Sequence, residues 1–210
     1  MPLTEILKII GLFIFCYLFG GIHFCNIISK SVGKKDLSKI GDKNPGGWNL
    51  VFNISKYWGI FGMWLDALKG FLSYFLVLLL TNSEMFALIG GCIAVLGHNY
   101  SPYYKFRGGK GIATTLGLFF AVSPWSMISM GVGFVGGLYI IRNMIWGVIF
   151  GIITPMVFLV FFLKSPIYLL LNLLLLIVVP KYINHSISFK ENFKFRKEAT
   201  LKDLFTPKKR

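Results

Sequence analysis

Charged residues are scarce in this 210-residue sequence, and acidic residues are the scarcest: 8 Asp and Glu stand against 22 Lys and Arg, and only 14% of all residues are charged. A water-soluble domain usually carries about 25% charged residues. The hydrophobic fraction is 55% and the mean hydropathy is +0.69. The composition therefore excludes a soluble enzyme and a disordered chain, and it predicts an integral membrane protein.

Cysteine is also rare. Cys16, Cys25 and Cys92 are the three cysteines, and each lies in an apolar run without the spacing of a metal site. They are interpreted as small buried apolar residues, which excludes a disulfide scaffold. The sequence predicts neither a metal nor a cofactor.

The excess of basic residues gives a formal net charge of +14. In a soluble chain this charge would favour nucleic acid as a partner, but no RNA-binding or DNA-binding module accompanies it. The basic residues stand between apolar runs, where membrane topology and lipid phosphates explain them better. Membrane lipids are therefore the expected partners, and nucleic acid is not.

Six apolar runs are candidates to enter the bilayer. They are residues 6–28, 57–80, 85–97, 112–141, 144–163 and 167–179. The fourth is too long for one span, and Pro124 supplies a break near Ser123-Pro124-Trp125, since proline lacks a backbone donor and disfavours helix in the residue before it. The sequence thus predicts an all-α integral membrane protein with seven transmembrane helices.

Basic residues also predict the orientation. They collect in the first loop, around residues 105–110, at Arg142 and in a tail over 181–210 that holds nine of them. With seven spans every basic segment faces the cytoplasm, as the positive-inside rule requires. We expect a single domain over residues 1–210, a multi-pass protein of the cell membrane, with its N-terminus outside and a cytoplasmic C-terminal tail.

Two segments on the expected cytoplasmic side carry chemistry. Residues 41–49 read Gly-Asp-Lys-Asn-Pro-Gly-Gly-Trp-Asn, a composition that allows a tight loop with exposed N–H groups. Residues 98–111 end in Gly-Gly-Lys-Gly directly before a predicted helix, so backbone N–H groups, the helix dipole and Lys110 favour an anion. The alternatives are a simple turn for the first segment and a basic surface loop for the second. The second is not a nucleotide-binding P-loop, because Tyr104 and Gly111 stand at positions that require Gly and Ser or Thr.

Isolated polar residues are weaker candidates. Asp66 and Lys69 lie one helical turn apart in an apolar span and either pair with each other or mark a site. Asn143 sits at a span end beside Arg142, a typical place for an interfacial anchor. His185 is either a base or an interfacial residue, and His23 is interpreted as a packed side chain.

Residues 96–114 and 65–70 resemble motifs of the bacterial acyl-phosphate:glycerol-3-phosphate acyltransferase family, PlsY. The first reads Leu-Gly-His through Phe-Arg-Gly-Gly-Lys-Gly-Ile-Ala-Thr, with the family's spacing from histidine to lysine, and the second reads Leu-Asp-Ala-Leu-Lys-Gly. The resemblance extends from about residue 11 to 163. The first family motif is altered: Ser38 replaces its arginine, Asp42 its serine and Lys43 its middle glycine. The third is weaker, because Ser188 stands where the C-terminal histidine element has asparagine.

The resemblance implies transfer of a fatty acyl group from acyl-phosphate to the 1-hydroxyl of glycerol-3-phosphate, forming lysophosphatidic acid for phospholipid synthesis. The implied catalytic residues are His185, Lys110 and Asp42. The implied substrate-binding residues are Gly108, Gly109, Gly111, Lys43, Asn44, Gly46, Asn49, Lys69, His98 and Asn143. Such a site faces the cytoplasm, and the chemistry fits a sequence without an activated Ser or Cys, since acyl-phosphate already carries a good leaving group.

Two other functions compete. A paralogue of the same fold accepts another polyol phosphate or is inactive, and a small anion transporter would also use basic loops and broken helices. No internal duplication supports the transporter. The sequence leaves the oligomeric state open.

Overall fold

The computed structural model describes residues 1–141, 144–163 and 168. These residues form helices and no strand, which agrees with the predicted all-α class. The helices are α1 (Leu3–Gly21), α2 (Phe24–Gly33), α3 (Gly47–Asn53), α4 (Lys56–Thr81), α5 (Glu84–Asn99), the short 3-10 helix η1 (Pro102–Tyr104), α6 (Ile112–Val122), α7 (Pro124–Ile141) and α8 (Met144–Leu163). The predicted span over 167–179 lies outside the described residues, apart from Tyr168.

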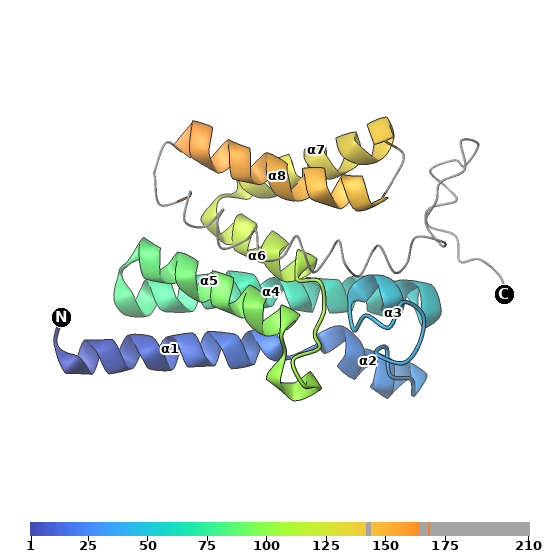
Figure 1. The fold of residues 1–210 in the computed structure, drawn as a ribbon, viewed down its shortest axis with the longest axis horizontal. Coiled ribbons are helices and arrows are strands. Elements are labelled where there is room, and N and C mark those ends of the chain that lie inside the picture. The colour runs from blue at the N-terminus through green and yellow to red at the C-terminus, as the bar shows by residue number, and fades with distance from the viewer. Residues whose placement is uncertain (142–143, 164–167, 169–210) are drawn as a thin grey trace.

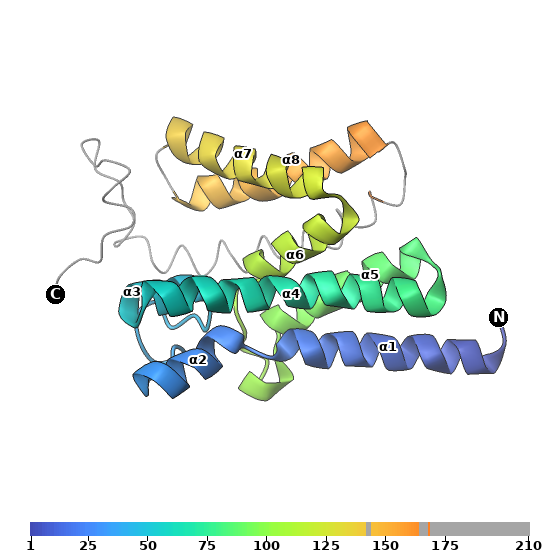
Figure 2. The ribbon, with the colours of Figure 1, turned by 180° about the vertical axis from the view of Figure 1, so that it is seen from behind.

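The helices form a layered bundle. Helices α1, α4 and α5 lie side by side, α7 and α8 pair as a hairpin, and α6 lies between that hairpin and the first layer (Figures 1 and 2). Three stretches are long and apolar enough to cross a membrane: Leu3–Gly33, which comprises α1 and α2, then α4, and α7. Large apolar side chains such as Tyr139 and Ile140 are more than 70% exposed on the bundle, which fits a lipid-facing surface.

The predicted break in the run over 112–141 is confirmed. Helix α6 ends at Val122, Ser123 is extended with φ −162° and ψ 127°, and α7 begins at Pro124. The hydroxyl of Ser126 donates to the carbonyls of Phe119 and Ser123 at 2.6 and 2.7 Å. The same two carbonyls also accept from the backbone N–H groups of Ser123 and Ser126 at 2.9 and 3.0 Å, so the backbone at the break is held by both amide and side-chain donors.

The first apolar run is also broken, which the sequence did not predict. Helix α1 ends at Gly21, Ile22 is extended, and α2 begins at Phe24. Two consecutive glycines before the break have low helix propensity. The carbonyls freed at the break accept hydrogen bonds from a lysine of another helix, as described below.

Helices α5 and α6 are too short to cross the hydrocarbon layer. Helices α5 and α6 have 16 and 11 residues, or about 24 and 17 Å at 1.5 Å per residue. Both are shorter than the ~30 Å hydrocarbon layer. The segment that joins them, residues 100–111, therefore begins and ends close to buried residues of α5 and α6.

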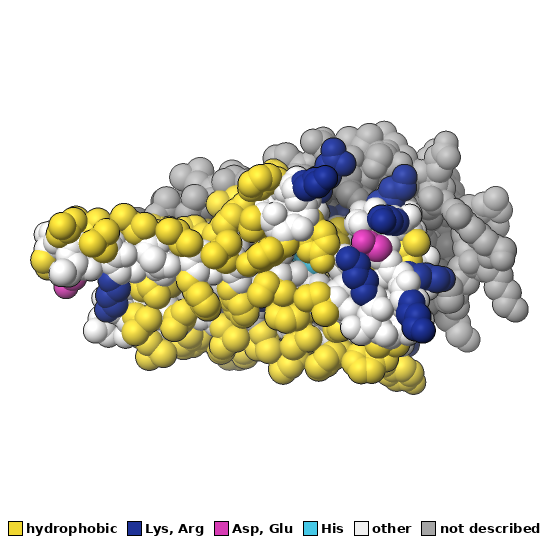
Figure 3. Space-filling model, turned by 90° about the horizontal axis from the view of Figure 1, so that it is seen from below, with side chains coloured by type: hydrophobic (Ala, Val, Ile, Leu, Met, Phe, Trp, Pro, Cys, Tyr) yellow, Lys and Arg dark blue, Asp and Glu magenta, His cyan; other side chains and the backbone are white. Residues whose placement is uncertain are grey.

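Basic side chains gather at one end of the molecule. Figure 3 shows Lys and Arg at the end that carries α2 and α3, next to a broad apolar surface along the helices. The loop over residues 34–46 and the loop over 100–111 together contain seven Lys and Arg residues. The two glycine-containing segments singled out in the sequence are therefore brought to a single region.

Candidate active site

The two glycine-containing segments meet through an ion pair. The Nζ of Lys110 lies 3.5 Å from Oδ2 of Asp42, and the two side chains are only 18% and 12% exposed. Lys110 comes from the loop before α6, and Asp42 comes from the loop between α2 and α3. A cation and an acid from distant segments thus share one partly buried position.

The loop over 34–46 is held by Asn49 of α3. Its Nδ2 donates to the carbonyls of Leu37, Ile40 and Asn44 at 2.9, 3.0 and 2.9 Å. Its Oδ1 accepts from Nδ2 of Asn53 at 2.7 Å. The amide that the sequence assigned to substrate binding is therefore engaged in shaping the loop, so Asn49 acts on the site through loop geometry.

Asp42, Lys43, Asn44 and Gly46 lie along the tip of this loop. Oδ1 of Asp42 accepts from the backbone N–H of Asn44 at 3.2 Å. Lys43 is exposed and has φ +56°, in the left-handed region. Asn44 is 6% exposed, and its Oδ1 has no hydrogen-bond partner among the described residues. Gly46 precedes α3 and packs against the amide of Asn44.

The glycines of the second loop lie against the end of α5. The N–H of Gly108 donates to the carbonyl of Asn99 at 3.1 Å, and the N–H of Gly109 donates to the carbonyl of His98 at 3.0 Å. These bonds fasten the loop, so the two N–H groups that the sequence assigned to phosphate are engaged within the protein. A Cβ at Gly109 would collide with the His98 ring, which explains the need for glycine there.

Helix α6 begins directly after this loop. Its N-cap is Gly111, with φ +79°, a backbone conformation that favours glycine. The first N–H groups of α6 have no partner within the helix, and the helix dipole places positive potential there. Lys110 precedes the cap, so its charge and the helix terminus act in the same region.

Electrostatics at Lys110 reflect two opposing effects. Burial lowers the pKa of the Lys110 ammonium below its ordinary value, because desolvation disfavours the charged form, and the Asp42 carboxylate raises that pKa in partial compensation.

Asp36 lies in the same loop as Asp42, and its pKa is lowered. Burial acts to raise its pKa, but hydrogen bonds from the side chain and backbone of Ser38 and the contact with Lys30 prevail and lower it to about 2.

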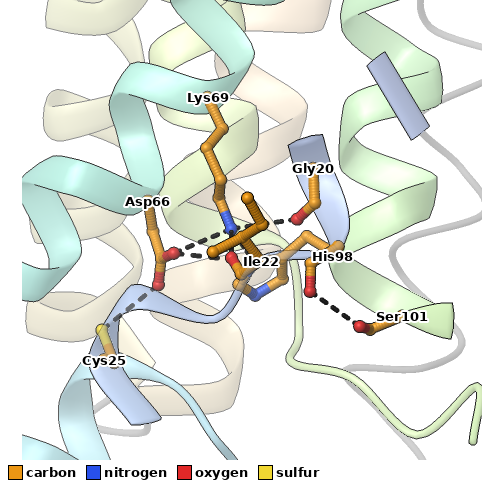
Figure 4. A network of polar contacts seen from close by, with 8 residues as sticks. Gly20, Ile22, Cys25, Asp66, Lys69, His98 and Ser101 are labelled. Atoms are coloured by element: carbon orange, nitrogen blue, oxygen red, sulfur yellow. Dashed lines mark hydrogen bonds and ion pairs between the residues drawn. The ribbon is translucent and has the colours of Figure 1, made fainter. Parts of the chain in front are cut away.

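Lys69 is buried among the helices and has four polar partners, one of them in an ion pair (Figure 4). Its Nζ lies 2.8 Å from Oδ1 of Asp66, 3.0 Å from the Gly20 carbonyl, 2.5 Å from the Ile22 carbonyl and 3.0 Å from Nδ1 of His98. The side chain is fully buried. The expected pairing with Asp66 is present. The sequence analysis also expected Lys69 to contact the substrate, but its donors face protein acceptors at the break between α1 and α2.

His98 links this network to the glycine loop. Because a lysine ammonium only donates hydrogen bonds, Nδ1 of His98 is the acceptor, which places the proton of a neutral ring on Nε2. That edge packs against Gly109. The ring also contacts His23 edge-on, with centroids 4.7 Å apart. His98 is 3% exposed and His23 is fully buried, so the expectation of a packed His23 is confirmed.

Asn26 connects the two loops, and the sequence analysis missed it. Its Oδ1 accepts from the N–H of Leu37 at 2.8 Å, and its Nδ2 donates to the hydroxyl of Tyr104 at 3.2 Å. Asn26 is fully buried. An amide in an otherwise apolar run was the available signal, since such residues are rarely placed in a membrane without a role.

Two predicted site residues cannot be placed. His185 and Asn143 lie outside the described residues, as does the tail over 181–210. The structure thus brings together Lys110, Asp42 and the loops that carry them, and it places Lys69, His98 and Asn49 in the supporting framework. Within the described residues no cluster of three or more potential metal ligands occurs.

Comparison with known proteins identifies the family. A model of the glycerol-3-phosphate acyltransferase family matches residues 10–194. A protein of that name from Thermosipho melanesiensis is 44% identical over 110 residues, and one from Endomicrobium trichonymphae is 36% identical over 140 residues. These alignments cover 52% and 65% of this chain, and 54% and 70% of the relatives. The chain thus spans about half of the first relative's length.

Comparison with solved structures points to the same family. Two crystal structures of PlsY (YgiH), an integral membrane glycerol 3-phosphate acyltransferase, match with a TM-score of 0.76 and 28% and 27% identity, covering 95% of this chain and 100% of each structure. One is the glycerol 3-phosphate form and the other the lysophosphatidic acid form. The fold and the site therefore define an all-helical membrane protein. The chain belongs to the glycerol-3-phosphate acyltransferase family, as the motifs at residues 96–114 and 65–70 predicted.

Proposed function

We propose that this protein transfers a fatty acyl group from acyl-phosphate to the 1-hydroxyl of glycerol-3-phosphate and so produces lysophosphatidic acid for phospholipid synthesis. The observation that carries the proposal is the placement of Lys110, between fastened glycines and the start of α6, against the loop over 34–46. Both substrates contain phosphate, and this arrangement presents a full charge and a helix N-terminus to an anion.

The reaction needs no covalent acyl-enzyme. The acceptor hydroxyl oxygen attacks the acyl carbonyl carbon, a new carbon–oxygen bond forms, and the bond to the phosphate oxygen breaks. Inorganic phosphate leaves with the electron pair, and the hydroxyl proton passes to a base. Lys110 balances charge on phosphate, and the alignment of two bound substrates supplies much of the rate.

Three groups compete for the role of base. His185 is the first, because histidine is the residue type that most often serves as a general base. A substrate phosphate oxygen is the second, and Asp42 is the third. We assign deprotonation or orientation of the acceptor hydroxyl to His185 and assign substrate contacts to Asn143, Lys43, Asn44 and Gly111. In this proposal Gly46, Gly108, Gly109, His98 and Lys69 support the binding site.

We further propose seven transmembrane helices, an outer N-terminus, and a cytoplasmic active site and tail in the cell membrane. The support is the gathering of basic side chains at the α2 and α3 end (Figure 3) and the helix break at Pro124. A cysteine at exposed Lys35 should react with a membrane-impermeant maleimide in inverted vesicles, and one at exposed Leu3 should react in right-side-out vesicles. The reverse pattern would contradict this orientation.

The acyl donor provides the decisive test of function. Purified full-length protein should release phosphate and form lysophosphatidic acid from acyl-phosphate and glycerol-3-phosphate, and it should form none from acyl-CoA. Mass spectrometry of the lipid product and a phosphate assay measure both halves of the reaction. Product from acyl-CoA alone, or phosphate movement across vesicles without acyl transfer, would overturn the proposal.

A second candidate function, acyl transfer to another polyol phosphate, is supported by one observation. Asp42 places a carboxylate 3.5 Å from Lys110, where PlsY-like motifs have a serine. A carboxylate repels a phosphate dianion and accepts hydrogen bonds from hydroxyl groups. The same donor assay with a panel of other polyol phosphates separates the two acceptors by their relative kcat/KM.

A further inference from the structure

The ion pair between Asp42 and Lys110 has a consequence for ligand binding. We propose that Asp42 is an exchangeable counterion: it neutralises Lys110 while the site is empty, and an incoming phosphate group takes its place. Asp42 then determines how tightly the site holds phosphate. The inference rests on the proposed function only in identifying the natural anion as a substrate phosphate.

The geometry fits a counterion that can be exchanged. The separation of 3.5 Å between Nζ of Lys110 and Oδ2 of Asp42 is longer than the 2.7–2.9 Å of a strong charge-assisted hydrogen bond. The other carboxylate oxygen accepts from the backbone N–H of Asn44 at 3.2 Å, a weak contact by its length. The two contacts of Asp42 within the described residues are thus both longer than a strong charge-assisted hydrogen bond.

Three of the other described acids are paired elsewhere, and the fourth, Glu5, lies in the first turn of α1. Asp36 pairs with Lys30 at 3.2 Å, Asp66 pairs with Lys69 at 2.8 Å, and Glu84 accepts from Tyr168. Among the described acidic side chains, Asp42 is the one that contacts a loop lysine next to a helix N-terminus. Its position is thus specific to the region where an anion is favoured.

The pair of Asp42 and Lys110 has a different effect before and after phosphate binds. A largely buried ammonium without a counterion is unfavourable, and burial already opposes the charged form of Lys110. The carboxylate removes that penalty in the empty site. A phosphate dianion repels the carboxylate and contacts the same ammonium, so binding must replace the Asp42 contact. The free energy of that exchange reduces the net affinity for phosphate.

Phosphate binding to purified full-length protein, measured by isothermal titration calorimetry, tests the exchange. With inorganic phosphate as the probe, Asp42→Asn should bind about tenfold more tightly than the unaltered protein, because a competing like charge is gone. Asp42→Ser should shift binding in the same direction, which guards against a defect peculiar to asparagine. Melting temperatures in detergent establish that each variant is folded.

Two controls identify the mechanism. Asp36→Asn removes the same charge from the same loop and should leave the phosphate affinity within about twofold, since that carboxylate is already paired with Lys30 at 3.2 Å. In a Lys110→Ala background, Asp42→Asn should give no tightening, because the partner of the exchange is missing. Equal tightening in Asp36→Asn, or tightening that persists without Lys110, would overturn the proposal in favour of a general charge effect.

The results separate this inference from the proposed function. If Asp42→Asn binds phosphate more tightly while the unaltered protein transfers no acyl group, the exchange stands and the proposed function fails. If acyl transfer is observed but Asp42→Asn loses turnover with unchanged or weaker phosphate binding, Asp42 is a base or a direct ligand. In that case the counterion role is overturned and the proposed function stands.

Discussion

Lys110→Ala should lower kcat/KM for acyl transfer by about 10³-fold, since loss of one preorganised charge-stabilising group typically costs 10²–10³. The side chain lies beside the α6 N-terminus and carries the positive charge nearest to Asp42 among the ion pairs of the described residues. Removing it takes away the buried cation next to the helix terminus, while the other proposed contacts remain. Steady-state kinetics with acyl-phosphate and glycerol-3-phosphate measure the change.

A matched control keeps this result specific. Lys35→Ala removes an exposed lysine from the same end of the molecule and should change kcat/KM by less than about twofold, because exposed charges are screened by solvent and salt. Turnover in Lys110→Ala within threefold of the unaltered protein would remove Lys110 from the active site. Equal losses in both variants would instead indicate a general dependence on surface charge.

Lys69→Met should destabilise the protein by about 3–5 kcal/mol, the usual cost of breaking a buried ion pair from one side. The substitution leaves the buried Asp66 carboxylate without its lysine and the Gly20 and Ile22 carbonyls without their donor. Because those carbonyls lie at the break between α1 and α2, activity should fall together with stability. Thermal unfolding in detergent measures the loss.

The charge component can be isolated with two further variants. Asp66→Asn combined with Lys69→Met should be more stable than Lys69→Met alone, because no unpaired buried charge remains. Lys56→Met makes the same chemical change at the exposed start of the same helix and should alter stability by about 0.5 kcal/mol or less. A double variant no more stable than the single one would show that the carbonyl contacts, and not the charge, dominate.

Local sequence features predicted much of the fold. Apolar runs located α4, α5 and α8 to within a few residues, and Pro124 located the boundary between α6 and α7. These features are local, because hydropathy and the missing N–H of proline act whatever the neighbours are. The break at Ile22 escaped prediction because it depends on Lys69, 47 residues away, to satisfy the freed carbonyls.

The sequence predicted only part of the candidate site, because residue types and their spacing are local and contacts between distant residues are not. The spacing of His98 and Lys110 and the glycines between them indicated phosphate binding. Glycines allow a tight loop with exposed N–H groups, and lysine supplies a positive charge. The partners of polar groups were not predictable. Asn49 holds three carbonyls and Asn26 joins two loops, and neither arrangement follows from spacing along the chain.

By itself the sequence determined that this chain enters a membrane as helices, that it carries a cationic glycine loop before a helix, and that it resembles one acyltransferase family. Helix packing, which the sequence does not reveal, decides which lysines lie near the candidate anion site and which are paired with buried acceptors inside the bundle. Lys69 is enclosed by acceptors from α1, α4 and α5, while Lys110 meets Asp42 at the junction of two loops. The physical reason is that a buried charge requires partners, and helix packing brings those partners from distant parts of the chain.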